Sequence, residues 1–288
     1  MKQRNFLNTI CISAAAAVLL LLQPACSKDD ASYSPDEMVI DVTQAYMYYF
    51  IIFREAETAW AQVHDDGYPV GKVDSTESRK VYYLLKTEIK TEGDTIKKYS
   101  IEVDFEDYRW NSTVLSGKIT VNLAADSSYT KNDRTTVSLS KFFINRQEVE
   151  GFSIISHTRN EETDQYSYTL ASGSIYSVDG EDILITSAVS SGVFHRTKGS
   201  ATTDTPEDDV WTFNGAMTGK IRNTESLKYS NAVHLPPTFY RDCSKKARQG
   251  VCTLTVGKQN IFYDYGVNGN PAACDSPIQI ETVTHNEH

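Results

Sequence analysis

Residues 116–123 read Ser-Gly-Lys-Ile-Thr-Val-Asn-Leu, and this stretch indicates the fold class. Between Ile119 and Leu123 apolar residues alternate with polar ones, which is the two-residue period of a strand with one buried and one hydrated face. A small residue followed by glycine also opens the segments at Ser172-Gly173 and Thr218-Gly219. Repeated segments of this kind predict an antiparallel sheet with one wet face.

Strand patterns continue on both sides of this stretch and are separated by turn signals. Glu92-Gly93-Asp94 and Asp179-Gly180 are hairpin turns by composition. The strand patterns lie at residues 81–89, 96–105, 137–144, 152–157, 166–170, 183–189, 252–256, 261–265 and 278–283. About ten to thirteen short strands predict a mainly β protein, a long curved antiparallel β-meander over residues 79–288. Two smaller β-sandwich or barrel-like domains are the alternative.

One long segment ahead of the strands has a helical pattern. Its apolar residues follow three-and-four spacing, at Ala45, Tyr49, Ile52, Ala56, Ala59, Trp60 and Val63. Ser34-Pro35-Asp36-Glu37 is a helix start signal and Asp66-Gly67 a stop signal. The pattern predicts an amphipathic α-helix over residues 36–66 that packs on the sheet. The dense aromatic run at residues 46–53 also fits a buried strand.

The N-terminus has the pattern of an export signal. Lys2 and Arg4 precede an apolar run at residues 10–22, which is shorter than the roughly 20 apolar residues that span a bilayer. Residues 1–25 are therefore predicted to be a signal peptide, and residues 26–35 a flexible tether. Ala25-Cys26 resembles a bacterial lipobox, so Cys26 is the predicted acylation site, for example with palmitate. An ordinary cleavage site of a secreted protein is the alternative.

Charge excludes one class of partner. Without Lys2 and Arg4, 26 of the 28 basic side chains remain against 38 acidic ones, a net charge of −12. A polyanion is repelled by such a field, and the chain has no Lys/Arg cluster that would release counterions from a phosphate backbone. Nucleic acid is therefore not an expected partner.

Three of the five cysteines belong to the expected mature body. Cys11 lies in the signal peptide and Cys26 is the anchor, which leaves Cys243, Cys252 and Cys274. Disulfides form and persist in exported proteins. Cys252 falls on the apolar face of a predicted strand, so the expected bridge joins Cys243 to Cys274.

Residues 264–275 carry part of a calcium-loop pattern. Asp264, Asn268 and Asp275 stand where an EF-hand loop has oxygen ligands, but Gly266 stands where another ligand is needed. Calcium is the one cofactor that this pattern suggests, and a plain turn at Asn268-Gly269 is the alternative.

Several short motifs resemble those of uncharacterised Bacteroides-type outer-membrane lipoproteins. They are the acidic tetrad Ser27-Lys28-Asp29-Asp30, Val103-Asp104-Phe105, Gly117-Lys118-Ile119, Asp242-Cys243, residues 250–254, Tyr263-Asp264-Tyr265-Gly266 and Cys274-Asp275. The resemblance implies an all-β body that is lipid-anchored at the outer membrane and faces the cell exterior. It implies no activity. Glu106 departs from the pattern, and no cysteine follows it nearby, so no bridge is expected in the first half of the body.

Two sites resemble the O-glycosylation pattern of exported Bacteroides-type proteins. Asp74-Ser75-Thr76 and Asp94-Thr95-Ile96 each place a hydroxyl residue after aspartate. Ser75 and Thr95 are the predicted acceptors, and both are expected in accessible turns.

Ser138-Leu139-Ser140-Lys141 has the spacing of a serine–lysine nucleophile motif, but on a strand Ser138 and Lys141 point to opposite faces. The sequence has no H-E-x-x-H, G-x-S-x-G, phosphate loop or dinucleotide fingerprint. No catalytic residue is therefore predicted. The expected function is non-catalytic adhesion, glycan binding or envelope assembly, with a membrane, a glycan or a surface protein as partner; exposed Trp and Tyr on the outer sheet face would favour it. The alternative is a surface glycan-active enzyme, which a cleft with two carboxylates about 5 to 9 Å apart would favour.

Overall fold

A computed structural model gives the structure of this chain. It describes residues 34–67, 70–91, 94–123, 136–151, 158–160, 165–170, 173–180, 183–197, 210–222, 225–231, 235–240, 243, 246–266 and 270–284. Residues 35–288 make up one compact unit. The predicted signal peptide, Cys26 and the predicted strand at residues 152–157 lie outside the described residues.

The long helix α2 covers Pro35–Asp65 and confirms the helix predicted from the sequence. Proline at the first helical position needs no amide partner, and Asp36 and Glu37 lie at the positive end of the helix dipole. Gly67, with a φ of 72°, follows the last turn. All residues from 46 to 53 are helical, so the alternative of a buried strand is wrong.

The strands form one antiparallel sheet. Their bounds are β1 Gly71–Ser75, β2 Arg79–Thr91, β3 Asp94–Trp110, β4 Thr113–Asn122, β5 Thr136–Ile144, β6 Gln147–Glu150, β7 Thr158–Asn160, β8 Gln165–Leu170, β9 Gly173–Tyr176, β10 Ile183–Thr197, β11 Val210–Ile221, β12 Glu225–Asn231, β13 Thr238–Tyr240, β14 Val251–Val256, β15 Gln259–Asp264 and β16 Gln279–Thr284.

The strand order confirms the predicted β-meander. Among the described residues, sixteen strands belong to a single open sheet in the order β1-β2-β3-β4-β5-β6-β9-β10-β11-β12-β14-β15-β16, with β7, β8 and β13 attached beside this path. The chain therefore forms one sheet and not two smaller domains. The sheet begins at Gly71 rather than at residue 79, because β1 has a single apolar residue, Val73, and no alternation that a sequence reading could detect.

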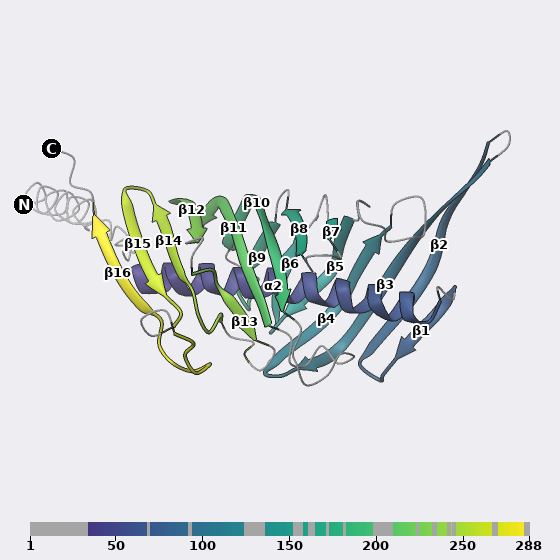
Figure 1. Ribbon diagram of the computed structural model, residues 1–288, viewed down its shortest axis with the longest axis horizontal. Helices are drawn as coiled ribbons and strands as arrows, with labels where there is room; N and C mark the ends of the chain where they lie inside the picture. Colours follow the sequence, from purple (N-terminus) through teal and green to yellow (C-terminus); the bar gives the residue numbers. More distant parts are fainter. Residues whose placement is uncertain are drawn as a thin grey trace, which may run out of the picture. The chain divides into compact units, whose positions relative to one another are not determined.

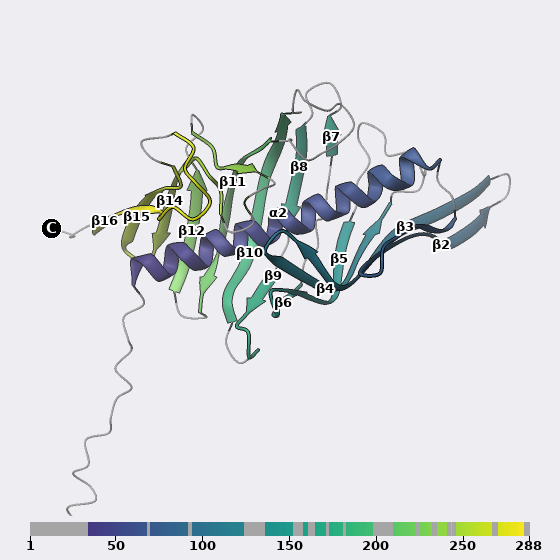
Figure 2. The same ribbon diagram turned by 90° about the horizontal axis from the view of Figure 1, so that it is seen from below.

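The helix lies along one face of the curved sheet, and the strands cross its axis (Figures 1 and 2). A helix of 31 residues is about 46 Å long. Thirteen strands on the main path, spaced about 4.8 Å apart, cover about 58 Å before curvature. One helix can therefore contact most of the sheet.

Aromatic side chains fill the space between α2 and the central strands. The Phe53 ring stacks on Phe194 of β10 with centroids 4.6 Å apart, and Phe50 stacks on Phe239 of β13 at 4.7 Å. Every residue from Tyr46 to Phe53 is buried. A helix that the sheet contacts on one side only would leave part of this run exposed. The curvature of the sheet therefore explains why the run from Tyr46 to Phe53 is apolar on all sides.

Polar contacts fix the C-terminal half of the helix to the first strands. Arg79 on β2 donates from Nε to Glu55 Oε2 at 3.0 Å and from Nη1 to Gln62 Oε1 at 2.9 Å. Gln62 donates in turn to Asp74 of β1 at 2.8 Å. Because Arg79 and Glu55 are both buried, removing Arg79 leaves an uncompensated charge on Glu55 and costs about 3 to 5 kcal/mol. Removing Glu55 leaves Arg79 with the more distant Asp74 carboxylate, at 3.9 Å.

A second ion pair holds the other half of the helix. Arg222, just after β11, donates from Nε to Asp41 Oδ2 at 3.3 Å. Burial raises the pKa of Asp41 to about 6, and Arg222 opposes the shift. The folded state therefore holds this proton more tightly than the unfolded chain does. Protonated, buried Asp41 contributes stability that is fully present below about pH 4 and is lost as the pH rises through about 6, where the carboxylate forms and pairs with Arg222.

Two paired glycines make room for a core aromatic ring. Gly192 of β10 and Gly215 of β11 are cross-strand partners. A Cβ at Gly215 would lie 2.2 Å from Phe213 Cζ, and a Cβ at Gly192 would lie 2.3 Å from Phe213 Cε2. The Phe213 ring occupies the space that side chains here would fill, and it packs against Tyr46 of the helix at 5.2 Å.

We therefore expect Gly215→Ala to lower the free energy of unfolding by about 1 to 3 kcal/mol, because the added methyl overpacks the core. Adding Phe213→Leu should recover part of that loss, and a double-mutant cycle in urea measures the coupling. Ala216→Ser, exposed on the same strand, is the matched control and should change stability by less than about 0.5 kcal/mol. Wild-type stability of Gly215→Ala would contradict this account of the glycine pair.

Candidate functional site

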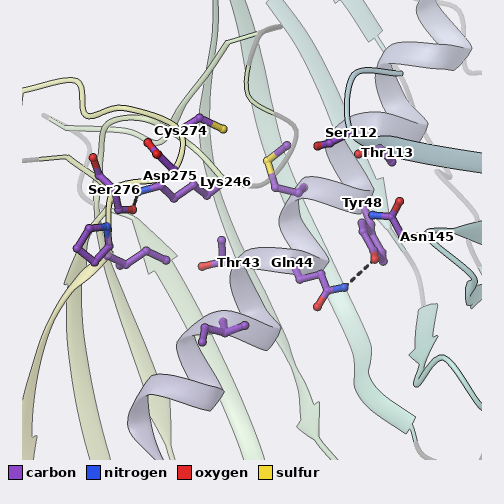
Figure 3. Close-up of a pocket in the computed structure, with 14 residues that line it drawn as sticks. Thr43, Gln44, Tyr48, Ser112, Thr113, Asn145, Lys246, Cys274, Asp275 and Ser276 are labelled. Carbon is purple, nitrogen blue, oxygen red and sulfur yellow. Dashed lines mark hydrogen bonds between the residues drawn. The ribbon is translucent and has the colours of Figure 1, made fainter. Parts of the chain in front are cut away.

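A cavity of about 660 Å³ lies against the N-terminal half of α2 (Figure 3). We call it the helix cavity. One stripe of the helix forms its floor, made by Ile40, Thr43, Gln44, Met47 and Tyr48. These positions follow the three-and-four spacing of a single helix face. The helix cavity therefore lies over a stripe of α2 that the sheet does not cover.

Turns from the first half of the sheet form one wall. Ser112 comes from the β3–β4 connection, Thr113 is the first residue of β4, and Asn145 comes from the β5–β6 connection. Asn145, at a φ of 52°, accepts the Val114 N–H at its Oδ1 over 2.9 Å, which ties the two turns together. We call these three residues the first wall; all three side chains are neutral and can form hydrogen bonds.

The segment that precedes β16 forms the second wall, with Cys274, Asp275, Ser276, Pro277 and Ile278. The Cys243–Cys274 disulfide holds this segment, with Cα atoms 5.4 Å apart, and confirms the predicted bridge.

Hydrogen bonds from Lys246 hold the second wall in place. Its ammonium donates to the carbonyl oxygens of Tyr265 and Ser276. Burial lowers the pKa of Lys246, whereas the nearby Asp275 carboxylate opposes that shift. Two of its three donors are used by backbone carbonyls, so Lys246 acts mainly as a structural cation.

A small network of hydrogen bonds joins two floor residues, Gln44 and Tyr48, to Gln147 of β6. Gln44 Nε2 donates to the Tyr48 hydroxyl at 2.6 Å and also to Gln147 Oε1, which accepts from Tyr48 as well. Burial raises the pKa of Tyr48 to about 12, so the phenol is neutral. The amide oxygen of Gln44 has no partner among the described residues, and Figure 3 shows it on the side away from Tyr48. It can accept a hydrogen bond from a ligand.

The chemistry of the helix cavity suits binding of a neutral molecule. Its volume is in the range of about 300 to 1,000 Å³ that small-molecule sites occupy. Among the described lining residues the charged ones are one lysine and one aspartate, which balance. Glycoside hydrolysis by the usual route needs two carboxylates, and within that described lining Asp275 is the single one.

A second, smaller hollow of about 360 Å³ lies over β14, β15 and β16. Its lining includes Phe262, which is 40 % exposed, together with Asp264 and Glu281 from neighbouring strands. We call it the β15–β16 hollow. All three tryptophans of the chain are buried, so no exposed tryptophan marks a binding face.

The residues of the suggested calcium loop line different hollows. Asp264 lines the β15–β16 hollow and accepts the Gly266 N–H at 2.8 Å, whereas Asp275 lines the helix cavity. Asn268 lies outside the described residues. Within the part of the chain that the structure describes, no group of three or more His, Cys, Asp or Glu side chains is placed to hold a metal ion.

The two predicted glycosylation sites lie in strands rather than in turns. Ser75 is the last residue of β1 and pairs with Lys80, and Thr95 is the second residue of β3 and pairs with Lys90. The turn placement was wrong because β1 has no apolar pattern that predicts a strand, and because β3 begins two residues before its apolar pattern does. Both sites remain predictions.

Sequence reasoning missed the residues of the helix cavity. Thr43 and Gln44 are two polar residues that directly precede the apolar run from Ala45 to Phe53, and this was the available signal. The wall residues gave no signal, since turn residues are polar in most proteins.

No protein-family model, curated protein or solved structure matches this chain. Across the described residues no helix has both the length and the apolar character that crossing a membrane requires.

The third cysteine provides a test of the disulfide assignment. Cys252 is buried and free, 3.3 Å from the Tyr229 hydroxyl, and burial raises its pKa to about 12. We expect a thiol reagent to label no cysteine in native residues 27–288 and one after unfolding.

The Cys243→Ser/Cys274→Ser double variant should lose about 3 to 4 kcal/mol of stability, because the bridge closes a loop with a sequence separation of 31. Three reactive thiols in the unfolded, non-reduced wild type would contradict the assignment.

Proposed function

We propose that this protein is a lipid-anchored protein of the outer membrane that faces the cell exterior and binds a glycan without catalysis, with the helix cavity as its site. The observation that carries the proposal is the set of neutral hydrogen-bonding groups in the first wall and on the floor, in Ser112, Thr113, Asn145 and Gln44. Sugar hydroxyls donate and accept hydrogen bonds without charge, so this lining complements them.

The predicted anchor is consistent with such a role. Residues 26–34 separate Cys26 from the first residue of α2 and can span at most about 30 Å when extended. A body tethered at this length stays close to the membrane surface. Its net charge of −12 favours solubility there.

One observation favours the alternative, a glycan-active enzyme. The β15–β16 hollow brings Asp264 and Glu281 onto one face of two neighbouring strands, beside the exposed ring of Phe262. Glycoside hydrolysis by the usual route needs two carboxylates on either side of the bond that is cleaved, and an exposed ring can stack on a sugar. If the chain cleaves glycans, Glu281→Gln should abolish cleavage.

For the anchor, we expect Cys26→Ala to abolish labelling with a fatty-acid probe and to release the protein from membranes, because the acylated thiol is lost. Labelling and membrane fractionation of the full chain measure both effects. An unlabelled wild type whose mature N-terminus is not Cys26 would refute lipidation.

For the binding site, we expect residues 27–288 to bind a defined subset of a glycan array and to release no shorter sugar. Ser112→Trp places a large ring at the first wall and should weaken that binding by at least about tenfold. Ser138→Trp, exposed on β5 and outside the lining, is the matched control and should bind like the wild type. Equal binding by both variants would exclude the helix cavity as the site.

A further inference from the structure

The two walls of the helix cavity differ in chemistry. The first wall is polar and neutral. The second wall carries Pro277, which is exposed, and Ile278, which is half-buried. A ligand that fills the helix cavity therefore meets neutral hydrogen-bonding groups on one side. On the other side it meets a wall that adds two apolar side chains to Asp275 and Ser276.

Ile40 extends the apolar side onto the floor. It is 55 % exposed, whereas its helix neighbours Val39 and Val42 are fully buried. A single exposed isoleucine is common on protein surfaces. Here, however, it lines the same cavity as Pro277 and Ile278, so the floor and the second wall together offer three apolar side chains to a ligand.

Charge also restricts the ligand. Lys246 and Asp275 are of opposite sign, line the same cavity and lie close to each other. Lys246 already donates to the carbonyls of Tyr265 and Ser276, which limits what it can offer to an anion. The open acceptor on the floor, the Gln44 amide oxygen, matches a hydroxyl or amide donor of a neutral ligand.

We infer that the helix cavity takes a neutral sugar that carries an acyl or alkyl substituent. The sugar hydroxyls bond to the first wall and to Gln44, and the substituent packs between Ile40, Pro277 and Ile278. This inference rests on the proposed glycan-binding function. An N-acylated polysaccharide and the head of a glycolipid share this chemistry, and the choice of probes distinguishes them.

The test measures the affinities of the full chain with Cys26→Ala for three probes by calorimetry. They are an N-acetylglucosamine trisaccharide, octyl glucoside below its micelle concentration and an unsubstituted glucose trisaccharide. We expect at least one substituted probe to bind at least about tenfold more tightly than the unsubstituted one, because burial of a few carbon atoms supplies that ratio. Preference for the first probe indicates an N-acylated glycan, and preference for the second a glycolipid.

Apolar-side variants locate the substituent. Ile40→Ser and Ile278→Ser should each remove most of this preference, because each removes apolar surface that the substituent contacts. Leu85→Ser, at an exposed leucine on β2, is the matched control and should keep the preference.

The possible failures are distinguishable. Tight binding of all three probes alike, sensitive to Ser112→Trp, would overturn this inference and leave the proposed function intact. A preference that survives Ile40→Ser and Ile278→Ser would also overturn it. Binding of none of the probes, together with an array that shows no glycan bound, would overturn both.

Discussion

The structure depends on burying one long apolar helix in a sheet that has no second layer. An open sheet needs cover on its apolar face, and α2 supplies that cover along most of its length. The same contact explains the curvature, since a flat sheet would touch one side of the helix only. The aromatic run at residues 46–53 and the paired glycines under Phe213 are two parts of this one packing arrangement.

Polar contacts set where along the sheet the helix lies. The C-terminal half of α2 is joined to β1 and β2 through Glu55, Arg79 and Gln62. The N-terminal half meets the last strands, where Thr43 and the Tyr265 hydroxyl are 3.1 Å apart. The helix therefore crosses the strands in the reverse of their chain order. Hydrophobic burial alone has no direction and would not choose this alignment.

The helix cavity follows from this arrangement. Because the sheet does not close, one stripe at the N-terminal half of α2 is left to the connecting segments. Segments from opposite ends of the sheet become its two walls, and a disulfide with a buried lysine fixes one of them. A rigid scaffold that carries binding groups on its connections is a common arrangement for ligand sites. The proposed function and the inferred ligand class both depend on this arrangement, in which the sheet and helix form the scaffold and the connecting segments carry the binding groups.

The sequence by itself determined the elements whose signals are local. Period-two alternation predicted the strands, three-and-four spacing predicted α2, turn chemistry located the hairpin at Asp179-Gly180, and the strand position of Cys252 left Cys243 and Cys274 as the bridge. Only the tertiary structure decided that β1 joins the sheet, that Ser75 and Thr95 end in strands, and that Ile40, Asn145 and Ile278 share one cavity. Periodicity and turn propensity act between neighbours in the chain. The cavity instead depends on how far the sheet curves around the helix, which is set by long-range packing that no local pattern records.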